Sequence, residues 1–345
     1  MRGGYPLTAT HPPNPLVLSL SKHRPFARAK RGEVGLTGTA SAQFNRAAKS
    51  VIDRAARWGH PGCNMKPETI RIPIGEGLTI AADIAGPRGA PTVILGHGGG
   101  QTRHSWDKAE LQLAQAGYFA INYDLRGHGD SDWSPDGDYS IDLRAKDLEQ
   151  VAAVGSRPVA LVGASLGGVT SLVAASHGLE PAAIVLVDIV PKMSQEGVGR
   201  IKAFMSANPG GFADLNEAAD AVAAYYPERP RPKDVSGLKK NLREGADGRL
   251  HWHWDPRMMD DFRRDPHYLL DLMDAADWTD RVPTLLVRGM KSDIVTEDGV
   301  DDLKRRIPAL EIADISGAGH MVAGDKNDEF NSAVIEFLTR VMPLG

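Results

Sequence analysis

Cysteine is almost absent from this sequence of 345 residues, which contains only Cys63. One thiol excludes a disulfide within the chain and a cysteine-rich metal site, and it fits a reducing compartment such as the cytoplasm. No apolar run reaches the roughly 18 to 20 residues that a helix needs to cross a bilayer, so no membrane span is expected. Neither sign of charge dominates, with 40 Lys and Arg against 44 Asp and Glu. This balance gives no reason to expect nucleic acid as a partner.

Residues 1–64 lack the alternation of strand and helix patterns that follows them. No acidic residue precedes Glu33, and the short apolar run Pro15–Leu20 has its basic residues after it, unlike a signal peptide. Met65 stands just before the first expected strand. We therefore expect residues 1–64 to be a disordered extension, or the native chain to start at Met65, with a transit or export segment as the alternative.

Ser165 lies at the centre of a Gly-x-Ser-x-Gly pattern that spans Gly163 to Gly167. An apolar strand pattern precedes it, and a helix-compatible run follows from Val169 to Ala175. In a strand–turn–helix context this pattern indicates a nucleophilic serine, raised above a sheet at a helix N-terminus. The glycines two residues before and after the serine, and Gly168 beyond them, allow the close packing that such a turn requires. A purely structural turn is the alternative.

A nucleophilic serine needs a base to remove its proton, and the base needs a third group to orient it. In this kind of fold the order along the chain is serine, acid, histidine. His320 is the only one of the eleven histidines beyond position 267, and it follows an apolar strand pattern in a glycine-containing loop. We expect His320 to be the base, with an ordinary surface histidine as the alternative.

The orienting acid should end a strand that lies between Ser165 and His320 in the chain. Asp293 follows the strand pattern Thr284–Val287 and is the acid that we expect. Asp188 ends the preceding strand pattern and is the alternative, because some enzymes of this fold use that strand.

A glycine run supplies the remaining part of such a site. The strand pattern Thr92–Leu95 leads into His97, followed by Gly98, Gly99 and Gly100. This His-Gly-Gly-Gly arrangement is typical of an oxyanion hole, in which backbone N–H groups bind the developing negative charge. The expected donors are the N–H groups of Gly99 and Leu166. A phosphate-binding loop is excluded because no Gly-Lys-Ser/Thr follows the glycines.

With these four features, the chain resembles the α/β-hydrolase superfamily from about Thr69 to its C-terminus. The stretch Asp124–Ser131 also resembles the D-x-R-G-x-G-x-S loop after the fourth strand of that family, where it is structural. The closest resemblance is to the lid-bearing branch of esterases, lactonases and cofactor-free haloperoxidase-like enzymes. Epoxide hydrolases and haloalkane dehalogenases of this branch carry an aspartate at the nucleophile position, so Ser165 argues against both chemistries.

The order of patterns predicts an α/β fold with a mostly parallel, eight-stranded sheet and helices on both faces. The expected strands are Thr69–Ile74, Leu78–Ile84, Thr92–Leu95, Phe119–Tyr123, Val159–Val162, Ala182–Val187, Thr284–Val287 and Leu310–Ile315. Residues 65–190 and 276–345 would form the hydrolase core. Residues 191–275, after the sixth strand, would form a helical lid.

The expected lid contains a large share of the aromatic side chains, and Tyr226, Trp252 and Trp254 are the substrate-binding candidates. His251 and His253 have the spacing of two metal ligands, but no third ligand is comparably placed, so no metal is expected.

The sequence thus predicts a serine hydrolase that cleaves a small to medium, moderately hydrophobic carboxylic ester without a cofactor. The alternatives on the same residues are cofactor-free haloperoxidase or perhydrolase chemistry, dioxygenase-type chemistry, and hydrolysis of a carbon–carbon bond.

Overall fold

The computed structural model of the chain describes residues 66–227, 231–263, 267–325 and 327–344. The chain divides into two units, residues 1–44 and 45–345, and every described residue belongs to the second. The expectations about residues 1–64, Cys63 and the start at Met65 therefore lie outside the described residues.

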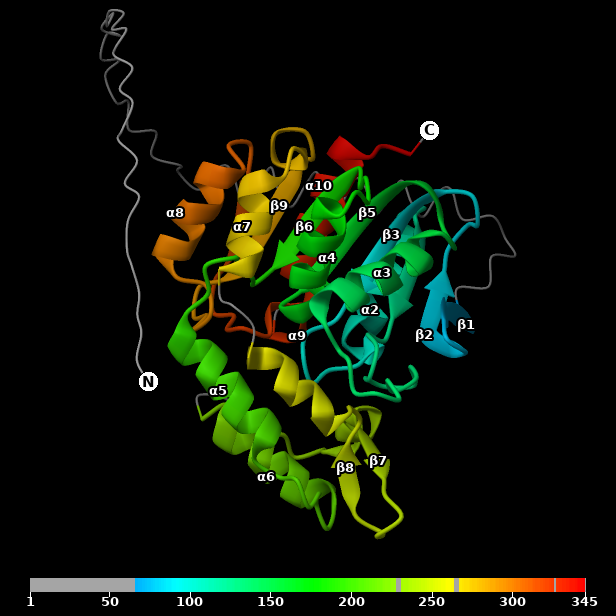
Figure 1. Cartoon of the computed structure of the whole chain (residues 1–345), viewed down its shortest axis with the longest axis vertical. Coiled ribbons are helices and arrows are strands. Elements are labelled where there is room, and N and C mark those ends of the chain that lie inside the picture. Colours follow the sequence, from blue (N-terminus) through cyan, green and yellow to red (C-terminus); the bar gives the residue numbers. More distant parts are fainter. Residues whose placement is uncertain (1–65, 228–230, 264–266, 326, 345) are drawn as a thin grey trace, which may run out of the picture. The chain divides into compact units, whose positions relative to one another are not determined.

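Eight strands of the described part form one sheet with the order β1-β2-β4-β3-β5-β6-β9-β10 (Figure 1). β2 runs antiparallel to both of its neighbours, and the other pairs are parallel. The strands are β1 (Glu68–Gly75), β2 (Leu78–Ala85), β3 (Pro91–Gly96), β4 (Phe119–Tyr123), β5 (Ser156–Ala164), β6 (Ala183–Val187), β9 (Thr284–Gly289) and β10 (Glu311–Ile315). The predicted mostly parallel sheet is confirmed.

The central strands are buried on both faces, as their continuous apolar sequences require. Every residue of β4, β6 and β9 is buried. Strands covered on both faces carry unbroken runs of Val, Ile and Leu, because no side of them meets water. The helices that cover them must therefore lie on both sides of the sheet.

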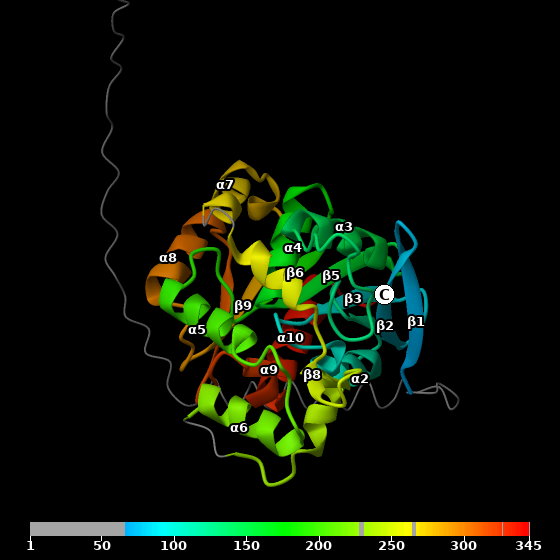
Figure 2. The same ribbon diagram turned by 60° about the horizontal axis from the view of Figure 1, so that its bottom comes forward.

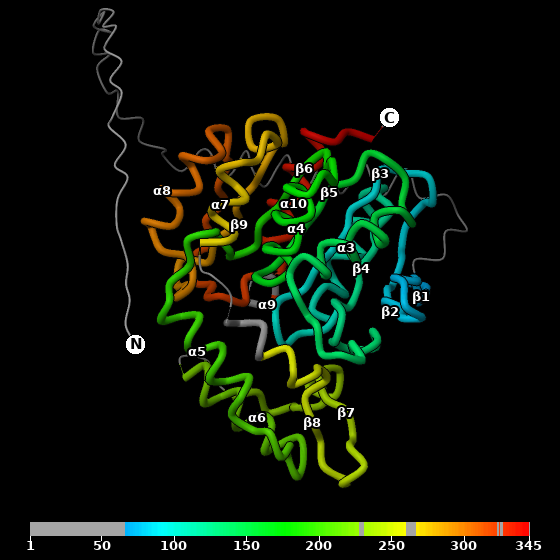
Figure 3. Tube along the Cα trace, viewed as in Figure 1, coloured from blue at the N-terminus to red at the C-terminus, as the bar shows by residue number. Residues whose placement is uncertain are grey.

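Two groups of helices cover the two faces. One apolar cluster joins the sheet to α3 (Ile141–Ala152), α4 (Leu166–Ser176), α7 (Tyr268–Ala275) and α8 (Glu297–Arg306). The other joins it to η1 (Arg103–Trp106), α2 (Asp107–Gln115), the start of α9 (Val322–Asp325) and α10 (Asn327–Val341). In Figure 3, α3 and α4 run in front of the strands and α10 behind them.

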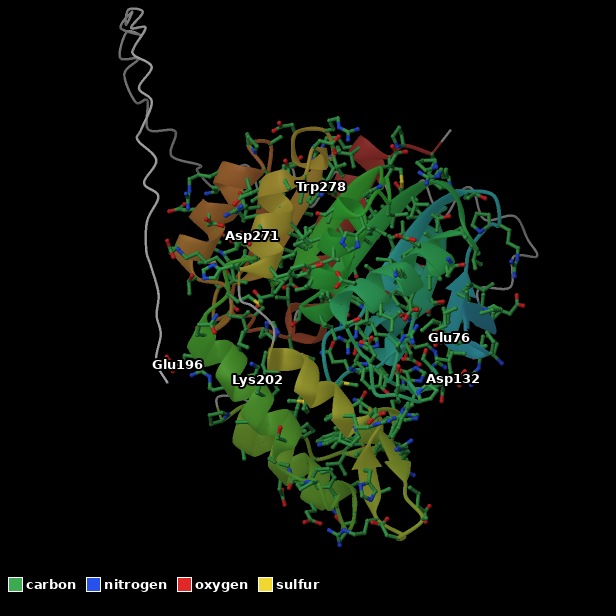
Figure 4. All side chains as sticks on the ribbon, viewed as in Figure 1. Glu76, Asp132, Glu196, Lys202, Asp271 and Trp278 are labelled. Atoms are coloured by element: carbon green, nitrogen blue, oxygen red, sulfur yellow. The ribbon has the colours of Figure 1, made fainter. Side chains whose placement is uncertain are left out.

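The chain between β6 and β9 forms an insertion, which we define as residues 189–283. It contains α5 (Gln195–Ser206), α6 (Leu215–Tyr225), η2 (Ser236–Asn241), β7 (Leu242–Glu244), β8 (Leu250–Trp252), η3 (Pro256–Arg263), α7 and η4 (Trp278–Asp280). Figures 1 and 2 show α5, α6 and the β7–β8 hairpin beyond one end of the sheet. Glu196 and Lys202, labelled in Figure 4, mark α5, and Trp278 marks the return towards the sheet.

The insertion was expected at this place, but its content differs from the expectation. Asp214 caps α6 as its sequence indicates, accepting hydrogen bonds from the backbone N–H groups of Asn216 and Glu217. The expected helical lid also contains a hairpin, because Leu242 of β7 pairs with Trp252 of β8. No described helix is long and apolar enough to cross a membrane.

Candidate active site

Ser165 lies between β5 and α4 in a backbone conformation that few residues adopt. Its φ of 44° and ψ of −110° place it in the strained region where functional residues gather. A Cβ on Gly163 would lie 2.4 Å from the carbonyl of Gly167, and one on Gly167 would lie 2.3 Å from the carbonyl oxygen of Gly96. Only glycines permit this turn, as its sequence pattern indicates.

Asp188 follows β6 at the same level of the sheet as Ser165. Ala164 pairs with Val187 across the two strands, and the Ser165 N–H donates to the Val187 carbonyl at 3.2 Å. Parallel neighbours end at the same edge of a sheet, so the residue after each strand projects from that edge. The nucleophile candidate and this carboxylate therefore leave adjacent strands together.

His320 contacts Asp188 directly. Its Nδ1 lies 2.8 Å from Oδ2 of Asp188, whose side chain is fully buried. A proton on Nδ1 satisfies this contact and leaves Nε2 with a lone pair. Within the described residues, Ser165 and His320 form no direct hydrogen bond, and such bonds commonly tighten only when substrate binds.

Two residues at the end of β9 hold the carboxylate of Asp188. The Gly289 N–H donates to Oδ1 at 2.9 Å, and the Ser292 hydroxyl donates to Oδ2. Gly289 also permits the histidine loop to approach, because a Cβ there would lie 2.3 Å from the Gly319 carbonyl oxygen. Neither residue was singled out from the sequence, although both flank the stretch in which the acid was sought.

The expectation that Asp293 orients the histidine is wrong in this structure. Asp293 Oδ2 instead accepts hydrogen bonds from Arg200 of α5, at 3.0 Å from Nε and 2.5 Å from a terminal nitrogen. The Asp293 side chain is about one-third exposed, and its partner leads into the insertion. The alternative acid, Asp188, occupies the position beside His320.

In the glycine loop, the N–H groups of Gly98 and Gly100 have acceptors within the described residues, whereas the N–H group of Gly99 has none. Gly98 N–H donates to Oε1 of Gln101 at 2.9 Å, and Gly100 N–H donates to Nε2 of His128 at 3.3 Å. For Gly99 N–H, and for Leu166 N–H at the start of α4, no acceptor lies among the described residues. A Cβ on Gly98 would lie 3.5 Å from Cβ of Ser165, so this loop borders the serine.

His97 supports the loop from within the core. Its Nε2 accepts a hydrogen bond from Leu125 N–H at 3.0 Å, and its Nδ1 faces the Gly98 carbonyl at 2.8 Å. Complete burial lowers the pKa of His97 to about 4, against the opposing effect of Asp124. A neutral ring with its proton on Nδ1 fits both contacts, so His97 braces the loop and is not a second base.

Apolar side chains of the insertion cover the glycine loop. A Cβ on Gly100 would lie 3.4 Å from the ring of Trp254 and 3.6 Å from Cε of Met205. Trp254 stacks on Trp252, with ring centroids 5.1 Å apart. Tyr226 lies at the end of α6, where its ring packs against Tyr225. Of the three predicted substrate-binding residues, Trp254 thus contacts the glycine loop. Trp252 packs against Trp254, and Tyr226 packs against Tyr225.

Met205 was missed because it belongs to α5, a helix that the sequence did not reveal. The glycine loop also contacts the residue that follows His320, because Nε2 of Gln101 donates a hydrogen bond to Sδ of Met321 at 2.8 Å.

Within the described residues, no three His, Cys, Asp or Glu side chains are grouped so that they could hold a metal ion.

Known proteins resemble this chain in sequence and in fold. The model of the alpha/beta hydrolase family matches residues 93–333, so the chain belongs to that family. It is 32% identical to esterase Rv0045c of Mycobacterium tuberculosis over 253 residues, which cover 69% of this chain and 79% of the relative. It is 27% identical to the sn-1-specific diacylglycerol lipase ABHD11 of Mus musculus over 337 residues, or 91% and 99% of the two chains.

Among solved structures, that of E-2-(acetamidomethylene)succinate hydrolase superposes with a TM-score of 0.69. Its sequence identity is 24%, and the match covers 79% of this chain and 99% of that one. This likeness shows the fold. The two sequence relatives are an esterase and a lipase, and the chain is a hydrolase of the same family.

Proposed function

We propose that this protein is a serine hydrolase that cleaves carboxylic esters through an acyl-enzyme. The observation that carries the proposal is the buried contact between Asp188 and His320, formed where the strained Ser165 turn ends the neighbouring strand. The esterase and lipase names of the relatives agree with it.

The reaction follows from the roles that these groups can take. His320 Nε2 removes the proton from Ser165 as its oxygen attacks the ester carbonyl, and Asp188 stabilises the imidazolium that forms. The N–H groups of Gly99 and Leu166 bind the oxyanion. His320 then protonates the departing alcohol, and water, activated by the same histidine, releases the acid from Ser165.

The substrate is proposed to be moderately hydrophobic and of small to medium size. Leu166, Met205 and Trp254 surround the position of Gly99 and Gly100, and none of these side chains carries a charge. Apolar walls favour an uncharged acyl or alcohol group next to the reacting carbonyl. In this proposal the insertion acts as a lid, which keeps water from the acyl-enzyme while the alcohol leaves.

The test combines a fluorophosphonate probe with a short-chain aryl ester and the variant Ser165→Ala. Labelling and turnover should both disappear in the variant, because no other hydroxyl is placed at the turn. Ser332→Ala, at a half-buried serine of α10 far along the chain from the turn, is the matched control and should behave as the wild type.

Undiminished turnover by Ser165→Ala would contradict the proposal. Peracid formation from a carboxylic acid and hydrogen peroxide, without ester cleavage, would identify perhydrolase chemistry instead.

A further inference from the structure

His128 lies in the loop between β4 and α3, and it is fully buried. The resemblance of this loop to the family pattern gives it only a structural role. In the structure, however, Nε2 of His128 accepts the hydrogen bond from the Gly100 N–H at 3.3 Å, while Nδ1 faces the Arg126 carbonyl oxygen at 3.3 Å. The imidazole therefore bonds to the peptide that follows Gly99.

The partners of His128 require an uncharged ring. An imidazolium has no lone pair and cannot accept a hydrogen bond from Gly100. Burial, followed by the neighbouring His97 ring and the charge of Arg144, lowers the pKa of His128 well below its usual value. The proton then lies on Nδ1, towards the Arg126 carbonyl, and Nε2 remains an acceptor.

The backbone of the glycine loop explains why this acceptor matters. Gln101 N–H donates to the Gly98 carbonyl at 3.2 Å, which closes a four-residue turn, and Gly100 has a φ of +74°. A positive φ at the third position is typical of a type II turn, which glycine favours. The peptide on either side of Gly99 must keep its orientation if the Gly99 N–H is to face a substrate oxygen.

We propose that His128 is a positioning residue for the oxyanion hole: by accepting the Gly100 N–H, it fixes the peptide beyond Gly99 and so the direction of the Gly99 N–H. The inference rests on the proposed ester hydrolysis for its kinetic readout. It assigns a role that differs from base catalysis, because His128 contacts the loop and not the reacting atoms.

The insertion also contacts the loop that carries His128, through backbone hydrogen bonds on both sides of that residue. Gly129 N–H donates to the His253 carbonyl at 2.7 Å, and Asp255 N–H donates to the Gly127 carbonyl at 2.8 Å. These backbone bonds place Trp254 against Gly100 while His128 bonds to the Gly100 N–H. The segment from His253 to Asp255 thus contacts both the glycine loop and the loop that carries His128.

Two substitutions separate the acceptor from the bulk of the side chain. His128→Leu fills similar space without an acceptor, whereas His128→Gln offers Oε1 near the position of Nε2. A misdirected oxyanion donor should lower kcat about 10- to 100-fold in the leucine variant and leave KM within about threefold, since the hole acts mainly in the transition state. Fluorophosphonate labelling of Ser165 should slow by a similar factor, and the glutamine variant should recover most of both rates.

Unchanged kcat in a folded leucine variant, or a loss that glutamine does not relieve, would overturn the proposal. A second measurement needs neither a variant nor activity. Imidazole ¹⁵N shifts of the full-length wild type should show two rings, His97 and His128, that stay neutral with the proton on Nδ1 across the pH range of the assay. A spectrum with fewer than two such rings would contradict the proposed acceptor. Ester turnover by the wild type and its loss in Ser165→Ala test the proposed function separately.

Discussion

At the scale of single residues, the two candidate acids differ in their partners. Asp188→Asn should lower kcat about 10³- to 10⁴-fold with little effect on KM, because an amide cannot hold the histidine tautomer or stabilise its cation. Asp293→Asn should change kcat less than about threefold, since it removes only a partly exposed pair with Arg200. Steady-state kinetics with one aryl ester, and melting temperatures to verify folding, would decide between them.

The reverse ranking of these two variants would show that His320 turns to Asp293 in the working enzyme. A large loss in both would indicate that the Arg200 pair also supports the site, and the Arg200→Gln variant would then share the Asp293→Asn defect.

The sequence could not choose between these acids because both satisfy the same rule. Each follows a strand that ends at the same sheet edge, and β6 and β9 are direct neighbours. Which of the two carboxylates contacts His320 depends on tertiary contacts, and residue spacing along the sequence does not reveal them. Ser292 and Gly289 donate hydrogen bonds to Asp188. Arg200, on a helix far away in the sequence, donates to Asp293 instead. Ser165, His320 and Gly99 could be named because strand, turn and glycine patterns constrain them locally.

At the scale of elements, the turn between β5 and α4 depends on close backbone packing. Gly163→Ala would place a Cβ 2.4 Å from the Gly167 backbone, which cannot move as the end of a flexible side chain can. We expect a loss of about 2 to 3 kcal/mol in the free energy of unfolding, together with lost esterase activity. Urea unfolding and fluorophosphonate labelling measure the two effects.

Gly199→Ala is the matched control, because Gly199 lies exposed within α5 with open space at its Cβ position. It should stabilise the protein by about 0.5 to 1 kcal/mol, through the higher helix propensity of alanine. If Gly163→Ala were as stable and active as this control, the close-packing explanation of the turn would be wrong.

The elements that could be predicted are those whose own sequence pattern indicates a strand or helix without help from tertiary contacts. All eight strands of the sheet lie within a few residues of their predicted positions. α5 escaped prediction because Gly197 and Gly199 weaken its helical pattern. Gly197 is nevertheless required, since a Cβ there would lie 2.4 Å from the Asp293 carbonyl oxygen. The helix owes its place to that tertiary contact and to its Ser194 cap.

At the scale of the whole molecule, the contacts between the insertion and the core include two at distant places beside the candidate site. Ser194 N–H donates to the Ile294 carbonyl at 3.0 Å, beside the loop that holds Asp188. The segment around Trp254 bonds to the loop that carries His128. The insertion therefore contacts both the acid and the oxyanion sides of the candidate site, so its packing and the geometry of the site are linked.

A buried carboxyl group on α2 should make the stability of the whole protein depend on pH. Glu110 is 1% exposed. Its Oε2 accepts a hydrogen bond from Asn122, and among the described residues Oε1 has no partner. Burial, partly opposed by the Asn122 hydrogen bond and reinforced by Asp83 and Asp107, raises the pKa of Glu110 from 4.5 to about 7.

Because the folded state then binds this proton more tightly than the unfolded state, stability should fall as pH rises from 4.5 towards about 7. The cost above that range is about 3 kcal/mol. Glu110→Gln removes the ionisation and keeps the shape, so it should raise the free energy of unfolding near pH 8 and change it little below about pH 4, where both states hold the proton. Urea unfolding of both proteins, with the exposed Glu336→Gln as control, measures this difference. An equal offset at the two pH values would mean that the mutation acts through packing, because a proton-linked effect must vanish once both states hold the proton.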